Sequence, residues 1–195
     1  MKGSLLGVHS RSAPVDLSER ELLRLVRSGD PSGTRALYER YVGYLTAVCS
    51  RYIPDRAAVK DILQDAFISI FSRIEDFEFR GEGSLRAWMT RIVVNGALKS
   101  LRGSGRLSYV EELPDREEEE LDSLPAVPPK VLAGMIKALP DGYRTVFNLF
   151  VFEKKSHKEI AQMLGIKENS SASQFFRARA LLARQIKEYL KHEER

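Results

Sequence analysis

Residues 156–182 read SHKEIAQMLGIKENSSASQFFRARALL, a stretch with the pattern of two helices joined by a tight turn. Ser156 and Glu159 have capping-box spacing, so each can satisfy a backbone amide of the other at a helix start. Ala161 is small where a second helix must cross closely, and Gly165 suits the left-handed residue that ends the first helix. The stretch therefore predicts a helix-turn-helix.

The second helix of this motif carries short polar side chains in its first turns, the part that enters the major groove in a DNA-binding helix-turn-helix. Gln can pair with adenine there, and Ser can pair with several base edges. Positive charge continues along the same helix at Arg177, Arg179 and Arg184. The alternative is a plain helical hairpin whose polar residues only face solvent. For DNA binding we expect five side chains on the exposed side of the helix: Ser170, Ser171, Ser173, Gln174 and Arg177.

Residues 88–102, WMTRIVVNGALKSLR, predict another helix, in which a narrow polar strip interrupts a broad apolar surface. At about 100° per residue, the polar side chains fall within one arc of roughly 80°. Cations on this strip suit phosphates, whereas an indole and an amide suit the face and the edge of an unpaired base. The alternative for a lone tryptophan at a helix start is a core anchor. The strip consists of Arg91, Arg102, Asn95, Trp88 and Lys99, and the preceding loop adds Arg80 and Arg86.

Asp55 is expected to cap a helix within residues 57–77, and this helix carries an acidic polar patch. Asp61, Gln64 and Asp65 have i, i+3 and i+4 spacing. They lie opposite an apolar stripe that is expected to be buried and consists of Leu63, Phe67, Ile70 and Ile74. Such a patch is either a solvated face or the contact for a basic protein partner. The residues alone leave both interpretations open.

The pattern along the whole chain is all-α, with two small helical domains joined by an acidic linker. We expect a disordered tail at 1–15, a first domain at 16–102 and a second, helix-turn-helix domain at 130–195. The segment 103–129 has four prolines and no apolar periodicity, which is typical of a flexible linker. It has two basic residues against eight acidic ones, whereas residues 79–102 have five against one. Basic surfaces therefore flank an acidic segment, a distribution that suits polyanion binding by both domains.

Composition and motifs argue against several other classes of protein. The single cysteine, Cys49, cannot form an internal disulfide, and the three separated histidines have no zinc-site spacing, so we expect no metal and no cofactor. The longest apolar run, 146–152, is far shorter than the roughly 18 residues of a membrane span, and the first residues are too polar for a signal peptide. For these two reasons the chain is expected to be cytoplasmic. It also has no nucleotide-binding glycine loop or catalytic triad, so it is not expected to be an enzyme.

Four blocks of this sequence resemble, in order and spacing, a bacterial RNA polymerase sigma factor of the extracytoplasmic-function (ECF) group of the sigma-70 family. The blocks are LYERYVGYL, VKDILQDAFISIF, FRGEGSLRAWMTRIVVN, and the long run from LPDGYRTVF through the helix-turn-helix. The resemblance covers about residues 17–102 and 130–190. It implies a region 2-like first domain, a region 4-like second domain, and a subunit that directs promoter-specific initiation. The implied partners are core RNA polymerase, through its largest and second-largest subunits, promoter DNA, and an anti-sigma protein.

The resemblance also implies roles for particular residues. Asp61, Gln64 and Asp65 match the contacts to the clamp helices of the polymerase's largest catalytic subunit, and the acidic linker matches a segment that threads the RNA exit channel. The loop from Phe79 to Leu85 matches the part that captures a flipped base of the minus-ten element. With the polar strip, the expected minus-ten residues are Phe79, Arg80, Glu82, Ser84, Trp88, Arg91, Asn95, Lys99 and Arg102. The expected minus-35 residues are Ser170, Ser171, Ala172, Ser173, Gln174, Phe176, Arg177 and Arg179.

The recognition helix departs from its relatives at several positions. Ala172 stands where Lys or Arg is usual, which removes a phosphate or base contact, and Phe175 and Phe176 are bulkier than the common occupants. Lys167 and Asn169 replace the serine and glycine often seen at the entry of this helix. Two other functions stay open: a regulator that binds duplex operator DNA without polymerase, and a helical protein-interaction module that binds no DNA.

Overall fold

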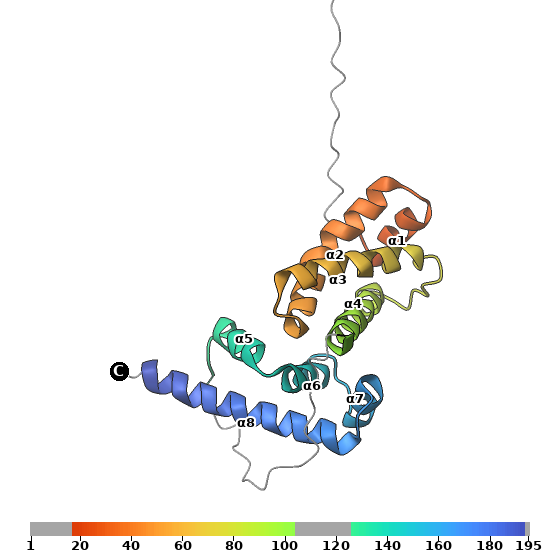
Figure 1. Ribbon diagram of the computed structural model, residues 1–195. Coiled ribbons are helices and arrows are strands. Elements are labelled where there is room, and N and C mark those ends of the chain that lie inside the picture. Colours follow the sequence, from red (N-terminus) through yellow and green to blue (C-terminus); the bar gives the residue numbers. More distant parts are fainter. Residues whose placement is uncertain (1–16, 104–125, 194–195) are drawn as a thin grey trace, which may run out of the picture.

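The computed structural model describes residues 17–103 and 126–193, and this part of the chain contains eight α-helices and no strand (Figure 1). The all-α prediction is therefore confirmed. The expected tail at 1–15 and nearly all of the expected linker at 103–129 lie outside the described residues. The first group of helices is α1 (Glu19–Arg27), α2 (Pro31–Tyr52), α3 (Arg56–Ser72) and α4 (Ser84–Gly103). The second group is α5 (Pro129–Ala138), α6 (Asp141–Val151), α7 (His157–Leu164) and α8 (Glu168–Glu193).

Side-chain caps determine where the first helices begin. The Ser18 hydroxyl accepts a hydrogen bond from the backbone N–H of Glu21, and the Glu21 carboxylate accepts one from the Ser18 N–H, so α1 starts with a complete capping box. Asp30 caps α2, with Pro31 in the first turn. The Asp55 carboxylate accepts a hydrogen bond from Ala58 at 2.9 Å, which starts α3 at the predicted boundary.

The long helix α2 packs against α1, α3 and α4 and forms the centre of the first group (Figure 1). Leu37 and Leu45 on α2 are fully buried. Each such leucine contributes about 1.5–3 kcal/mol by leaving water. Gly33 permits the close crossing with α1, since a Cβ at this position would lie 2.7 Å from Leu25. The predicted buried stripe on and after α3 is confirmed at Leu63, Phe67, Ile70 and Ile74.

The second group packs directly on the first, so one hydrophobic cluster spans both groups. Val146 and Leu149 of α6 belong to this cluster. The buried Arg144 guanidinium donates to the carbonyl of Tyr52 at 3.0 and 3.2 Å, and the Asn148 amide donates to the carbonyl of Arg51 at 2.7 Å. These contacts satisfy carbonyls at the end of α2, which have no partner within the helix. The two sets of helices therefore form a single packed unit.

A smaller hydrophobic cluster fixes α8 within the second group. Ile136 and Leu139, at the end of α5, contact Ala178 and Leu182 in the middle of α8. The Arg144 side chain lies beside this cluster, because it also donates to the Leu139 carbonyl at 2.6 Å. α8 is thus held along its middle, and its first turns are left to pack against α6 and α7.

Candidate nucleic-acid and polymerase surfaces

The polar strip predicted on the helix at 88–102 is present on the outer side of α4. Its apolar positions, such as Val93 and Ala97, are fully buried against the rest of the first group. The strip itself follows the helix at intervals of three or four residues, so its side chains lie along one line. Four of its members are exposed: Arg91, Asn95, Lys99 and Arg102. The structure therefore brings three cations and one amide together on an accessible surface.

Trp88 differs from the other members of the strip, because it is only partly exposed and packs against the hydrophobic core. Its ring lies 4.9 Å from the Phe77 ring, in a tilted arrangement. Aromatic pairs of this kind add stabilisation beyond the area that they bury. The contact favours the core-anchor interpretation of Trp88. Through Phe77 it holds the segment before α4 against this helix.

The loop before α4 is shaped by two glycines and one serine. Gly81 and Gly83 have φ values of +113° and +86°, a region that favours glycine. The Ser84 hydroxyl donates to the Gly81 carbonyl at 2.6 Å and accepts from the Arg80 N–H at 3.2 Å. The Arg80 side chain is exposed and pairs with Glu78 at 2.7 Å. The loop is therefore a compact turn that holds its own backbone and presents Arg80 to solvent.

Two loop side chains that were predicted to meet DNA contact α1. The Arg20 guanidinium lies over the Phe79 ring, 4.9 Å from its centroid. Both carboxylate oxygens of Glu82 accept the backbone N–H of Glu19 at 3.2 Å. Glu82 thereby caps the start of α1, a role that its place in a glycine-rich loop did not reveal.

Glu19 is a buried acid that sequence reasoning missed. Only 3% of this residue is exposed, and its carboxylate accepts from the Tyr41 hydroxyl at 2.8 Å and from the Leu85 and Arg86 amides at 3.1 and 3.2 Å. The pKa of Tyr41 is raised well above its usual range, mainly by burial and to a smaller extent by the hydrogen bond to Glu19. An acid in the first turn of a helix is ordinary, so the sequence held no signal of this contact with α4.

The acidic patch on α3 is exposed, as the sequence suggested, but its members line two different hollows. Asp61 and Asp65 line a hollow of about 570 Å³ between α3 and α4, together with Lys99. Gln64 lines the groove on the other side of α3. Lys99, expected on the minus-ten surface, therefore lies beside the acidic patch as well.

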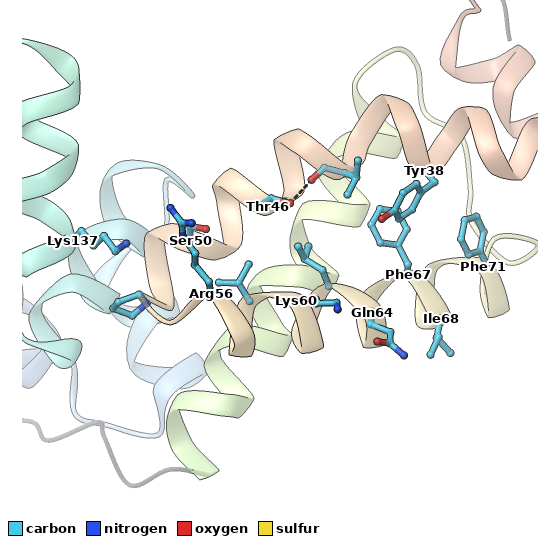
Figure 2. A pocket seen from close by; sticks show the side chains of 14 residues that line it. Tyr38, Thr46, Ser50, Arg56, Lys60, Gln64, Phe67, Ile68, Phe71 and Lys137 are labelled. Atoms are coloured by element: carbon cyan, nitrogen blue, oxygen red, sulfur yellow. Dashed lines mark hydrogen bonds between the residues drawn. The ribbon is translucent and has the colours of Figure 1, made fainter. Parts of the chain in front are cut away.

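The groove between α2 and α3 has a volume of about 910 Å³ and an apolar floor (Figure 2). Phe67 lies against the Tyr38 ring, with centroids 4.8 Å apart, and Ile68 is 61% exposed at the rim. Figure 2 shows cationic side chains at the opposite end, from Arg56 on α3 and Lys137 on α5. Exposed apolar area of this kind marks interaction surfaces in soluble proteins. The sequence did not reveal it, since the floor forms only when α2 and α3 pair.

The helix-turn-helix prediction is confirmed in its local geometry. Ser156 and Glu159 form the capping box that starts α7, and Gly165 ends this helix in the left-handed conformation with φ of +70°. Hydrogen bonds from Lys155 and from Ser156 lower the pKa of Glu159 to about 2. The small Ala161 is buried where α8 packs against α7.

The first turns of α8 differ from the prediction, because most of the side chains expected on the exposed side are buried. The Ser171 hydroxyl lies 3.0 Å from Nδ1 of His157, and the Ser173 hydroxyl donates to the Asn169 carbonyl at 2.8 Å. Serine and alanine are small enough for either a buried or an exposed helix face, so apolar periodicity did not fix the rotation of α8. The expectation of exposure is wrong for four residues: Ser170, Ser171, Ser173 and Gln174.

Gln174 is the least satisfied of these buried side chains. Neither its amide nitrogen nor its carbonyl oxygen has a hydrogen-bond partner among the described residues. A buried amide without partners costs several kcal/mol relative to water. The remaining predicted residues of the helix are partly exposed: Ala172, Phe176, Arg177 and Arg179. Phe175, one of the unusual residues, packs against Phe150 with centroids 4.4 Å apart.

Comparisons with known proteins match both groups of helices. The family model described as Sigma-70 region 2 matches residues 37–107, and the one described as Sigma-70, region 4 matches residues 130–182. The ECF RNA polymerase sigma-E factor of Haemophilus influenzae is 27% identical over 184 residues, covering 87% of this chain and 96% of that protein. The sigma-E factor of Escherichia coli is 26% identical over 184 residues, covering 87% and 95%.

Two solved structures are also similar to this chain. One is the structure of CnrH in complex with the cytosolic domain of CnrY, at 25% identity and a TM-score of 0.47, covering 87% of this chain and 97% of that chain. The other is the sigma factor RpoE in complex with the anti-sigma factor NepR from Bartonella quintana, at 17% identity and a TM-score of 0.46, covering 78% and 96%. Within residues 17–103 and 126–193, no helix has both the length and the apolar character needed to cross a membrane.

Proposed function

Since the chain belongs to the extracytoplasmic-function group of the sigma-70 family of RNA polymerase sigma factors, we propose that it binds core polymerase and opens promoter DNA through α4. The observation that carries this proposal is the exposed line of Arg91, Asn95, Lys99 and Arg102 beside a compact loop. The cations would neutralise phosphates, Asn95 would contact a base edge, and stacking on an aromatic ring such as Phe79 supplies about 1–3 kcal/mol per unpaired base. That free energy is comparable with the few kcal/mol needed to extrude a base, so trapping could open the strands without hydrolysis.

We propose that the minus-ten surface consists of the loop and the strip acting together. Phe79, Arg80 and Ser84 would contact the captured base from the loop, while the exposed residues of α4 would follow the backbone. Trp88 would contribute mainly by holding the loop against α4, as its contact with Phe77 suggests. We assign these roles to the proposed region 2 domain, residues 16–102.

The proposed region 4 domain, residues 130–195, would bind the minus-35 duplex through α8. Ala172, Phe176, Arg177 and Arg179 are partly exposed and could reach the groove directly. The four buried residues would need the surroundings of α8 to move before they could contact DNA: Ser170, Ser171, Ser173 and Gln174. Minus-35 binding is therefore expected to depend on a change in packing that polymerase brings about.

Core polymerase would bind α3 on both sides of the acidic patch. Asp61 and Asp65 offer carboxylates to a basic partner, and Gln64 continues the surface into the apolar groove. The acidic linker would enter the RNA exit channel. An anti-sigma protein is a further expected partner.

The same proposal makes this chain a non-catalytic subunit that works in the cytoplasm. Its contribution would be binding alone, since trapping a base requires no bond to be made or broken. The rival hypothesis, a regulator that binds duplex operator DNA without polymerase, is not favoured, because the region 4 match is accompanied by a region 2 match. A protein-interaction module without DNA binding is disfavoured for the same reason.

Run-off transcription with core polymerase and genomic DNA tests the function directly. We expect discrete products only when the chain is added, and their start sites give the promoter sequence. The variant Asp61→Arg with Asp65→Arg should abolish binding to core polymerase while the helices stay folded. A complete absence of new products from the wild-type chain would refute the proposed function.

A further inference from the structure

Helix α1 lies outside residues 37–107, the part that the region 2 comparison matches. It nevertheless contacts the proposed minus-ten loop at several points, and none of its residues has a role in the proposed function. The contacts involve the first two residues of α1, Glu19 and Arg20.

The first contact runs from α1 to the start of α4. The Glu19 carboxylate accepts hydrogen bonds from Leu85 and Arg86, whose amides lie in the first turn of α4 and have no partner within that helix. Tyr41 on α2 donates to the same carboxylate at 2.8 Å. A buried carboxylate is tolerated only with such partners, and it is favourable at the positive end of a helix dipole. Glu19 thereby fixes the exit of the loop.

The second contact runs in the opposite direction, from the loop to the start of α1. The two oxygens of Glu82 each lie 3.2 Å from the Glu19 backbone nitrogen. This N–H belongs to the first residue of α1 and is one of its unsatisfied amides. The capping is therefore reciprocal. The Glu19 carboxylate of α1 caps the start of α4, and the Glu82 carboxylate of the loop caps the start of α1.

The loop needs such external support because its own backbone is permissive. Gly81 and Gly83 both adopt positive φ, and glycine exchanges between backbone regions at little cost. Arg20 adds a third contact, over the Phe79 ring at the loop entry. The loop is therefore held to α1 at its entry, its middle and its exit.

We propose that α1 is the positioning element of the minus-ten loop, with Glu19 and Glu82 as positioning residues that preorganise the loop to capture an unpaired base. The inference rests on the proposed function and assigns Glu82 to the protein rather than to DNA. Preorganised contacts raise affinity because binding then costs less ordering of the loop. Loosening either carboxylate lets the loop sample other conformations, so capture weakens while polymerase binding is unaffected.

The test uses holoenzyme assembled from core polymerase and the full chain. The probe is a fluorescent single-stranded oligonucleotide with the non-template minus-ten sequence of a promoter that run-off transcription has identified. Glu82→Ala should lower affinity for this oligonucleotide about 5- to 10-fold, the change in affinity that corresponds to the free energy of one helix cap if binding must restore the released loop. Glu82→Gln should retain most of the affinity, because its amide oxygen can still accept the Glu19 N–H. The matched control is Asp76→Ala, which removes an exposed carboxylate from the same connection between α3 and α4.

Glu19 is tested with the isosteric Glu19→Gln, since Glu19→Ala could unfold α1. The effects of Glu19→Gln and Glu82→Ala on oligonucleotide affinity should not be independent. The fold-loss of affinity in the double variant should therefore be smaller than the product of the two single fold-losses. Affinity for core polymerase and the melting temperature are measured on every variant. For Glu82→Ala, the affinity for core polymerase should match the wild type, and the melting temperature should fall by only about 2–4 °C, the effect of one lost helix cap in a chain of this size.

Two results would overturn the inference. One is wild-type oligonucleotide affinity for Glu82→Ala in a holoenzyme that transcribes normally. The other is a Glu82→Gln variant that prefers a different base at the captured position, which would identify Glu82 as a direct base contact. Failure of the proposed function is distinct from both, because the wild-type holoenzyme would then make no promoter-dependent transcript.

Discussion

The two surfaces proposed to read DNA, on α4 and on α8, are in opposite states in the same molecule. Arg91 and Asn95 of α4 are exposed, and the loop beside them is held by α1. On α8, Ser171 and Gln174 are fully buried, and the Gln174 amide has no partner within the described residues. A helix can therefore carry side chains suited to DNA and still not present them to a ligand. Availability on α8 is set by its packing against α6 and α7 within the second group.

The largest effect is expected from Arg144, which joins the two groups. Arg144→Met should lower the free energy of unfolding by about 3–5 kcal/mol, because it leaves buried carbonyls, such as that of Tyr52, without a donor. Urea denaturation measures the loss. The control is Arg184→Met, whose side chain is 68% exposed, with an expected change within about 0.5 kcal/mol. A loss below about 1 kcal/mol for Arg144→Met would mean that the two groups separate in solution.

Thiol labelling compares the two surfaces directly. The native Cys49 is buried, and burial raises its pKa to about 11, so it gives little background reaction. A cysteine introduced by Asn95→Cys should react freely, whereas Ser171→Cys should react about 100-fold more slowly, since it must wait for local opening. Equal rates would show that the first turns of α8 are open in the free chain.

Asn95→Ala sharpens the role of the exposed surface. It should weaken strand opening by about 1 kcal/mol, the lower end for hydrogen bonds between a side-chain amide and a base edge, while duplex binding by the holoenzyme changes little. Permanganate reactivity of unpaired thymines measures the opening. The neighbouring exposed Ser100→Ala serves as the control. An equal loss of duplex binding and opening would argue against base trapping by Asn95.

The smallest effect concerns His157, whose ring packs beside those of Phe150 and Phe175 and lies next to Ser171. Burial lowers its pKa from the ordinary value of 6.5, and the Glu168 carboxylate partly opposes this shift. A lowered histidine pKa stabilises the fold above pH 6.5, and the stabilisation is lost as pH falls through the lowered folded-state value. When the pH is lowered from 7.5 to 5.5, the melting temperature of the wild type should therefore fall further than that of His157→Gln. Parallel profiles would contradict this.

Local signals along the chain predicted the elements well. Ser156 with Glu159, Asp55 and Gly165 act as the caps and stops that their spacing indicated, because capping involves residues only two to four positions apart. The exposed strip on α4 could be predicted for the same reason. Its apolar positions are large aliphatic residues, which leave one orientation of the helix.

Contacts between distant residues were invisible to the same reasoning. Glu19 has the sequence context of an ordinary helix-start acid, and Leu85 lies 66 positions away from it. Likewise, the small residues of α8 permit more than one rotation of the helix, so the burial of Ser171 had no local signature. The groove floored by Phe67 depends on the approach of α2 and α3.

The amino-acid sequence alone determined the helices, their ends, the family to which the chain belongs and the charged strip on α4, because each depends on neighbouring residues or on recognisable motifs. Tertiary structure alone decided that Glu19 and Glu82 link α1 to the loop, and that the first turns of α8 are buried. The physical reason is that hydrogen bonds and burial between distant segments arise only when the backbone brings those segments together. Residue type and spacing do not encode which partner a buried carboxylate or a small serine will meet.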